Sequence, residues 1–256
     1  MELVHNFSLV HDDAMDRDAV RRHRETVWKV YGVPAAILAG DALLTLALQV
    51  LSELATPVTQ TAVTMLNDAV QQLIEGQALD LSFETRGEVL LSECVAMAGK
   101  KTAALMSCAC GLGALVSGGS AEQVRLLRAF GAHLGLAFQL ADDLLGISGD
   151  PEVTGKPAHN DLWTRKKSLP VVAALTSGTD AGRELAALYG RDERWEHADL
   201  QRAQALVERA GGLAWTREEA DRRVDLALSS LAAADLDPGA AADLGGLVRL
   251  AARRDH

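Results

Sequence analysis

The first 22 residues, MELVHNFSLVHDDAMDRDAVRR, decide how the rest of the chain is interpreted. In residues 1–10 apolar side chains recur at three- and four-residue spacing, which is the period of an amphipathic helix. This helix runs into Asp12, Asp13 and Asp16, and a pair of arginines follows at positions 21 and 22. Asp12 and Asp16 are one helical turn apart, so their carboxylates share a face and repel each other. The stretch therefore predicts a helix that ends in an acidic cluster suited to a hard cation such as Mg²⁺.

The helical period continues through nearly the whole chain. Ala and Leu dominate and alternating β-branched runs are scarce, so we expect an all-α bundle in a single domain, residues 1–256, without a sheet. The segment GISGDPEVTGKPAHND, rich in Gly and Pro, is the one long connection expected within the bundle. The expected helices cover residues 1–16, 34–54, 57–79, 86–116 with a break near Gly99, 121–147, 167–177, 181–190, 198–210, 214–234 and 239–253.

Composition and charge exclude several classes of function. The chain has 256 residues, a net charge of −10 and 48% hydrophobic residues, which suits a globular protein and argues against a general nucleic-acid binder. Cys94, Cys108 and Cys110 provide neither a disulfide framework nor a tetrahedral zinc set, so we expect core packing and a reducing, cytoplasmic environment. No signal-peptide pattern opens the chain, and the apolar windows are too short and interrupted to predict stable membrane insertion.

A second acidic pair, Asp142 and Asp143, ends another apolar stretch at FQLADDLLG. Its apolar neighbours suggest partial burial, which is costly for a carboxylate that is neither paired nor metal-bound. A lone acidic cluster or a lone basic pair is more often solvated surface. Their co-occurrence favours a site for metal ions and a polyanion such as a diphosphate. The basic residues are Arg21, Arg22, Lys100, Lys101, Lys156, Lys166 and Lys167.

LVHNFSLVHDDAMDRDAVRR and AFQLADDLLGISGDPEVTGKPAHNDLWTRKKSLP closely resemble the two aspartate-rich regions of the trans-isoprenyl diphosphate synthases, or polyprenyl synthetases. LAGDALL, GQALDLSFE (76–84), KTAAL (101–105) and the arginines at 253 and 254 extend the resemblance along the chain. The resemblance implies an isoprenoid synthase-type helical bundle around a central apolar cavity. It also implies a Mg²⁺-dependent prenyltransferase that joins an allylic diphosphate to isopentenyl diphosphate, with no nucleic acid and no membrane insertion.

The resemblance assigns roles to individual residues. About three Mg²⁺ ions would bridge the diphosphate to Asp12, Asp13, Asp16, Asp142 and Asp143. The residues that would grip the allylic diphosphate are Arg21, Lys101, Lys156 and Lys166, and Arg22 would help to hold isopentenyl diphosphate. Thr102 and Gln139 would face the developing allylic cation, and Gln77 and Asp80 would lie beside the metal ions.

Phe7 gives a prediction of product length. It lies five residues before Asp12, where a bulky ring would stop a prenyl tail that grows down the helix away from the metal ions. In the resembling family, an aromatic residue at this place implies a product near C20. We therefore expect geranylgeranyl diphosphate, with C15 farnesyl diphosphate as the neighbouring possibility. Ordinary core packing explains Phe7 equally well.

The chain departs from the family pattern at three places. Family members carry roughly one more helical layer before the first acidic motif, which helps to bind isopentenyl diphosphate, and residues 1–10 do not replace it. His23 and Glu25 stand where the family has Gly and Pro after its paired arginines. Gly146 stands where many members have a third aspartate, for which Asp150 is a partial substitute.

Two other functions stay open at this point. A class I terpene cyclase would share the bundle, the metals and the first motif, but the second motif does not match and the chain is only 4% aromatic. A non-catalytic subunit of a longer synthase fits the missing layer, but it does not need intact acidic residues. The resemblance also implies a homodimer, for which the apolar faces of 34–54 and 57–79 are candidates, although core packing explains them as well.

Overall fold

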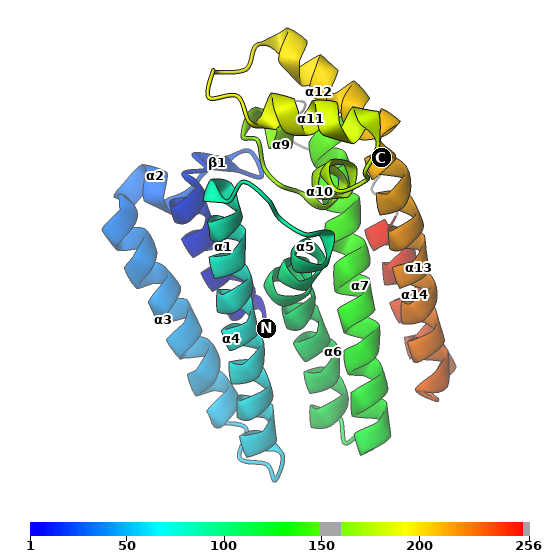
Figure 1. The fold of residues 1–256 in the computed structure, drawn as a ribbon. Coiled ribbons are helices and arrows are strands. Elements are labelled where there is room, and N and C mark those ends of the chain that lie inside the picture. Colours follow the sequence, from blue (N-terminus) through cyan, green and yellow to red (C-terminus); the bar gives the residue numbers. More distant parts are fainter. Residues whose placement is uncertain (149–159, 253–256) are drawn as a thin grey trace.

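The computed structural model describes residues 1–148 and 160–252, and it confirms the expected all-α class (Figure 1). Lys156, Asp150 and the arginines at 253 and 254 lie outside the described residues. The elements are α1 (Glu2–Asp16), β1 (Val20–Arg21), β2 (Arg24–Glu25), α2 (Val27–Tyr31), α3 (Val33–Ser52), α4 (Thr59–Thr85), α5 (Leu91–Ala98), η1 (Gly99–Ala103), α6 (Ala104–Val116), α7 (Ala121–Ser148), α9 (Asn160–Trp163), α10 (Leu169–Leu175), α11 (Asp180–Tyr189), α12 (His197–Arg209), α13 (Gly212–Ala233) and α14 (Pro238–Ala252).

The bundle is organised around α7. Helix α6 packs on one side of it and α13 on another, while α1 packs against α3. The C-terminal ends of α1, α4 and α7 lie at the same end of the bundle, the upper end in Figure 1. Helices α9 to α12, which we name the C-terminal lobe, cover this end beside α7. The fold therefore gathers the ends of the two acidic helices in one region.

The expectation of no sheet is wrong at one place. Strands β1 and β2 form an antiparallel hairpin in which Arg21 pairs with Arg24. The tip residues Arg22 and His23 have φ angles of 50° and 63°, the left-handed conformation that a tight turn requires. Strands of two residues are too short to show a period of two in the sequence. The helices α2 and α9 were not predicted because segments of five and four residues are too short to show the helical period.

Helix α4 runs well beyond its expected end at residue 79. Phe83 continues the apolar face one turn after Leu79, and both pack in the same core cluster. The helix ends where Arg86 turns to extended backbone. Arg86 then donates hydrogen bonds of 2.9 and 3.0 Å to Glu93, which also accepts the N–H of Leu90 at the start of α5. The segment expected to begin a helix at residue 86 is therefore a capped connection.

The expected break near Gly99 is a π-helical turn, η1, between α5 and α6. A π turn holds one residue more than an α turn and is frequent at functional sites. Gly76 of α4 lies directly against it, because a Cβ at position 76 would be 2.3 Å from the backbone nitrogen of Lys101. The absence of a side chain at Gly76 brings the polar residues of α4 close to those of η1.

Helix α3 has an exposed apolar face. Ile37, Leu38, Leu46 and Val50 are exposed, and Leu38 reaches 69%. Among the described residues, α3 is long and apolar enough to span a membrane, and 17% of the relevant window is buried. The apolar stretch was expected to be too interrupted for a membrane span, but by length and composition it is long and apolar enough. Length and composition alone do not distinguish a membrane-spanning helix from an apolar helix of a soluble protein.

Candidate functional site

The first acidic cluster lies at the C-terminal end of α1. Asp13 is 5% exposed, whereas Asp16 is exposed. The β1–β2 hairpin folds Arg21 back onto the helix, where its Nε donates to Asp13 Oδ1 at 2.6 Å and its Nη2 lies 3.7 Å from Asp12 Oδ2. Burial raises the pKa of Asp13, and Arg21 opposes that rise. Desolvation and the charge of Asp12 raise the pKa of Asp16 to about 6, although its side chain still meets solvent.

Lys101 of η1 connects this cluster to α4. Its Nζ lies 3.1 Å from Asp12 Oδ1 and 2.6 Å from Asp80 Oδ2. Burial acts to lower the pKa of Lys101, but the two carboxylates outweigh burial, so the pKa is raised and the ammonium stays charged. Gln77 lies one turn before Asp80, and its buried Nε2 has no hydrogen-bond partner among the described residues.

The second acidic pair ends a chain of hydrogen bonds on α7. The Thr102 hydroxyl donates to Gln139 Oε1 at 2.6 Å, and Gln139 Nε2 donates to Asp143 Oδ1 at 2.7 Å. The N–H of Leu169 donates to Asp143 Oδ2 at 2.8 Å. Asp143 is 4% exposed, and burial raises its pKa to about 7. Asp142 is exposed, so the two neighbours have different environments.

Lys166 interacts electrostatically with both acidic clusters. Burial acts to lower its pKa, but surrounding carboxylates raise it well above the usual range. These carboxylates are Asp161, Asp143, Asp80 and Asp142. The charge of Lys166 also acts to lower the pKa of Asp16 in the first cluster. Lys166 is therefore within electrostatic range of the ends of α1, α4 and α7.

The carboxylate of Asp161 occupies the space that any side chain at position 146 would need. A Cβ at Gly146 would lie 2.5 Å from Asp161 Oδ2. The carboxylate missing from position 146 is thus supplied to the same neighbourhood by a residue fifteen positions later. Asp161 was not among the site residues predicted from the sequence. A useful signal would have been an acid placed between the glycine-rich connection and the basic run 165–167.

The remaining predicted residues are placed differently. Phe7 is buried in the core between α1, α3 and α4, with its ring 5.0 Å from that of His11 in an edge-on arrangement. Arg22 is exposed at the hairpin tip and, within the described residues, makes none of the contacts that Arg21 makes with α1. Lys156 lies outside the described residues. The structure therefore brings Arg21, but not Arg22, to the acidic cluster.

The carboxylates have the right chemistry for Mg²⁺, but they do not by themselves form a complete coordination shell. Among residues 1–148 and 160–252, no group of three or more His, Cys, Asp or Glu side chains is arranged to hold an ion. Asp12 Oδ1 is buried and accepts no hydrogen bond, although Lys101 Nζ is 3.1 Å away. Such an oxygen is available as a ligand. The donor set fits an ion that takes its other ligands from water and substrate phosphates, as Mg²⁺ usually does.

Comparison with known sequences gives consistent matches. The sequence model of the family described as Polyprenyl synthetase matches residues 1–207. The (2E,6E)-farnesyl diphosphate synthase of Mycobacterium tuberculosis is 47% identical over 250 residues, which cover 96% of this chain and 70% of that protein. The geranylgeranyl diphosphate synthase of the same bacterium is also 47% identical, over 256 residues, 100% of this chain and 72% of that protein.

Solved structures agree with these matches. A polyprenyl synthetase from Streptomyces coelicolor A3(2) superposes with a TM-score of 0.93 at 46% identity, covering 98% of this chain and 76% of that one. A geranylgeranyl pyrophosphate synthase from Corynebacterium glutamicum, complexed with isoprenyl diphosphate and magnesium, gives a TM-score of 0.90 at 27% identity, with 99% and 77% covered. Since sequence and structure match along nearly the whole chain, the protein belongs to the polyprenyl synthetase family.

Proposed function

We propose that the protein is a trans-prenyltransferase that condenses an allylic diphosphate with isopentenyl diphosphate to a linear all-trans prenyl diphosphate. The observation that carries this proposal is that the acidic ends of α1 and α7 lie at one end of the bundle around Lys101 and Lys166. The relatives named as farnesyl and geranylgeranyl diphosphate synthases support it, as does the related structure that contains isoprenyl diphosphate and magnesium.

The charges of the site suit departure of a diphosphate. Lys101, Lys166 and Arg21 provide fixed positive charge, and fixed charge stabilises a leaving group as its negative charge develops. Mg²⁺ bound through the outer carboxylates would supply further charge neutralisation together with the substrate phosphates. We assign the outer role to Asp12, Asp16 and Asp142, which are less buried than their neighbours. Asp13 and Asp143 would hold the site together through the hydrogen bonds described above.

Bond formation needs a cation that water does not reach. Breaking the allylic C–O bond leaves its electron pair on the diphosphate and an allylic cation, which the alkene of isopentenyl diphosphate attacks. The departing diphosphate then accepts a proton from the new chain. Thr102 and Gln139 place two polar oxygens next to each other below the acidic clusters, and we propose that these dipoles stabilise the cation. Apolar helix faces would exclude water.

Product length is proposed to be C20, with Phe7 as the residue that stops the growing tail. Phe7 is buried and lies about 7.5 Å along α1 from Asp12, because five residues separate them at about 1.5 Å each. The two Mycobacterium relatives carry C15 and C20 names at equal identity, so overall similarity does not decide between these lengths. Replacing Phe7→Ala should lengthen the main product, which product chromatography after phosphatase treatment would show.

We further propose a cytoplasmic homodimer that uses the exposed apolar face of α3. A face that includes Leu38, Leu46 and Val50 is costly in water, and a second copy of the chain would cover it. Sedimentation of the wild type and of Leu38→Glu tests this proposal. A dimer that becomes monomeric in the variant supports it, and a wild-type monomer contradicts it.

A product assay tests the activity. The purified chain would receive Mg²⁺, labelled isopentenyl diphosphate and, separately, C5, C10 and C15 allylic diphosphates. We expect a linear prenyl diphosphate whose formation stops with EDTA and in the Asp12→Asn variant. A hydrocarbon made from the allylic substrate alone would instead identify a cyclase. No turnover by a folded wild type would contradict the proposal.

A further inference from the structure

Arg165, Lys166 and Lys167 are consecutive cations, and the side chains of the first and the last are bound to two different parts of the fold. The backbone N–H of Lys166 donates to the carbonyl of Asp161 at 2.8 Å, and nearby carboxylates raise the pKa of its side chain. Arg165 and Lys167 instead hydrogen-bond to backbone carbonyls on opposite sides of it. A basic run on a surface would leave all three side chains in water. Here the two outer side chains fix the chain on either side of the inner one.

Arg165 attaches this run to the C-terminal lobe. Its two terminal guanidinium nitrogens donate to the backbone carbonyls of Arg191 and Glu193, and its Cζ lies 5.0 Å from the ring centroid of Trp195. Arg165 has a left-handed φ of 51°, an unfavourable conformation for a side chain that has a Cβ. A planar guanidinium can bond two carbonyls and stack on a ring at once, which an ammonium cannot do.

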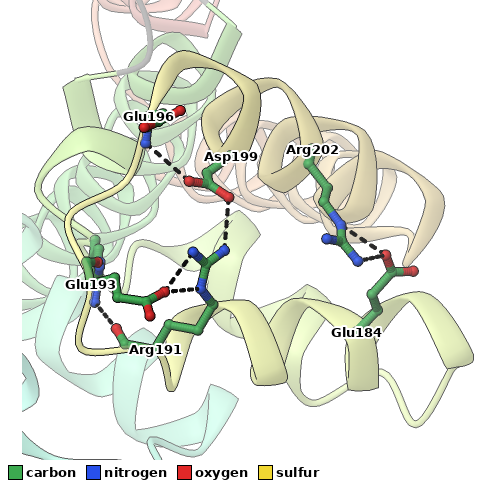
Figure 2. A network of polar contacts seen from close by, with 7 residues as sticks. Glu184, Arg191, Glu193, Glu196, Asp199 and Arg202 are labelled. Atoms are coloured by element: carbon green, nitrogen blue, oxygen red, sulfur yellow. Dashed lines mark hydrogen bonds and ion pairs between the residues drawn. The ribbon is translucent and has the colours of Figure 1, made fainter.

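The loop that accepts Arg165 is itself braced. Arg191 lies between Glu193 and Asp199, at 2.8 and 2.9 Å, as Figure 2 shows. Asp199 also accepts the N–H of Glu196 at 3.0 Å (Figure 2). Trp195 is buried against Tyr189, with ring centroids 5.0 Å apart. The carbonyls that hold Arg165 are therefore part of an ordered loop and not of a loose one.

Lys167 attaches the run to the end of α4. Its Nζ donates to the carbonyl oxygens of Phe83 and Arg86 at 2.6 and 2.5 Å. Carbonyls at a helix C-terminus lack helical partners and favour a cation. Desolvation, together with the charge of Arg86, lowers the pKa of Lys167. Burial and Arg86 therefore disfavour the charged ammonium, and the two hydrogen bonds to carbonyls oppose them. Helix α4 also carries Asp80, which contacts Lys101.

We infer that Arg165 and Lys167 are positioning residues that form a clamp, holding Lys166 toward the acidic clusters. This inference rests on the proposed function, because it assigns Lys166 to the diphosphate. The backbone between the anchors is fixed further by the Lys166 N–H, which donates to the Asp161 carbonyl at 2.8 Å, and by the Leu169 N–H, which donates to Asp143. The clamp thus ties the C-terminal lobe and α4 to the acidic pair of α7.

Kinetics of single and combined variants test the clamp. Arg165→Met and Lys167→Met should each lower kcat about tenfold to a hundredfold with a smaller change in KM, because a misplaced group loses transition-state stabilisation. In a Lys166→Met background, either substitution should change kcat less than about threefold, since the residue being positioned is already gone. Independent, multiplying losses would overturn the inference.

Conservative and matched variants separate positioning from folding. Lys167→Arg should recover most of kcat, because Arg can also reach two carbonyls. Arg165→Lys should keep the melting temperature but not kcat, because it cannot bond both carbonyls and stack. The control Arg202→Met removes an ion pair with Glu184 in the same lobe, and Lys29→Met removes an exposed cation. Both controls should stay within about twofold of the wild-type kcat.

Binding of Mg²⁺ and inorganic pyrophosphate, measured by calorimetry, distinguishes failure of the clamp from failure of the proposed function. If the wild type turns over and both Met variants match the controls, the clamp is overturned and the function stands. If the wild type makes no product but binds pyrophosphate, the activity is wrong, and the clamp still predicts about tenfold weaker binding in both variants. If the wild type neither turns over nor binds, both inferences fail.

Discussion

The pairs Asp12–Asp13 and Asp142–Asp143 are the same dipeptide, and each lies toward the C-terminal end of an apolar helix. Their buried members, Asp13 and Asp143, accept hydrogen bonds from different kinds of donor. Asp13 accepts a hydrogen bond from the charged guanidinium of Arg21 at 2.6 Å. Asp143 accepts hydrogen bonds from neutral donors, the side-chain amide of Gln139 and a backbone N–H. Both residues are almost fully buried. The buried members therefore differ in the charge of their hydrogen-bond donors and not in burial.

This difference shows how one dipeptide can combine two tasks. In each pair one aspartate is less buried, while the buried one joins neighbouring elements. Burial raises the pKa of both buried members. Arg21 opposes the rise for Asp13 through a direct hydrogen bond, whereas the pKa of Asp143 stays at about 7 although the charge of Lys166 and its neutral hydrogen-bond donors oppose the rise. Without metal ions, Asp143 should therefore hold a proton up to a pH of about 7.

The largest expected effect is loss of activity when an outer carboxylate is neutralised. Asp12→Asn and Asp142→Asn should each lower kcat by about a hundredfold or more, because they remove ligands for charge stabilisation at the diphosphate. The melting temperature should not fall. Steady-state kinetics and thermal unfolding of the same preparations check both statements. If either variant instead turned over substrate nearly normally but melted at a lower temperature, that aspartate would have a structural role and would not be a metal ligand.

A stability loss should follow when the cation of the first pair is removed. Arg21→Met leaves Asp13 buried without its charged partner, which should cost about 2 kcal/mol of unfolding free energy. Urea denaturation of metal-free protein measures it. Arg24→Met, on the facing strand of the same hairpin, is the matched control and should cost much less. Equal losses in the two variants would indicate that the hairpin matters and the Asp13 contact does not.

The pH dependence of stability should differ between wild type and Asp143→Asn. An unfolded aspartate has a pKa of 3.8, and that of Asp143 is raised to about 7, so between these values the folded state keeps a proton that the unfolded state has lost. The stabilisation from this group is full below pH 3.8 and is lost as pH rises toward 7. Metal-free wild type should therefore lose stability relative to the variant, by up to about 1.4 kcal/mol per pH unit. Parallel pH curves would contradict a protonated Asp143.

The smallest expected effect concerns the neutral hydrogen bonds of the second pair. Thr102→Val removes the 2.6 Å hydrogen bond to Gln139 and should cost about 1 kcal/mol of unfolding free energy. If the hydroxyl also faces the cation, the increase in activation free energy calculated from kcat should exceed this loss of unfolding free energy. Thr45→Val, which removes a hydrogen bond to a carbonyl on exposed α3, serves as the control for hydroxyl loss in a helix. Unchanged kcat would leave Thr102 with a structural role alone.

The parts that the sequence predicted depend on local geometry. Helical spacing alone puts Asp12 and Asp16 on one face, and apolar periodicity alone predicts the long helices that carry the two acidic pairs. The resemblance of the run KTAAL selected Lys101 and Thr102 as candidates, and the structure brings both to polar partners on other helices. The helices and the shared face of Asp12 and Asp16 could be predicted because they depend only on neighbours within one helical turn.

The parts that the sequence did not predict depend on distant segments. Nothing in the spacing separates buried Asp143 from exposed Asp142, because that difference arises from packing against residues 168–170. The contacts of Arg165 are with backbone carbonyls, which carry no residue-specific pattern. The proximity of Gly146 and Asp161 likewise needs the fold, since it joins α7 to the next described helix.

The π-helical turn η1 constrains how the length of the chain can vary. Deleting one residue from Gly99–Ala103 would convert this turn to a regular α-helix and leave α5 and α6 in nearly the same relative orientation, because a π turn holds only that one residue more. The packing of α6 on α7 and the hydrogen bond from Cys94 of α5 to the carbonyl of Lys167 would both survive. The deletion would instead change the placement of Lys101 and Thr102 within η1, which contact Asp80 and Gln139. Among related chains we therefore expect a gap in residues 99–103 to be excluded by these polar contacts and not by the packing of the neighbouring helices.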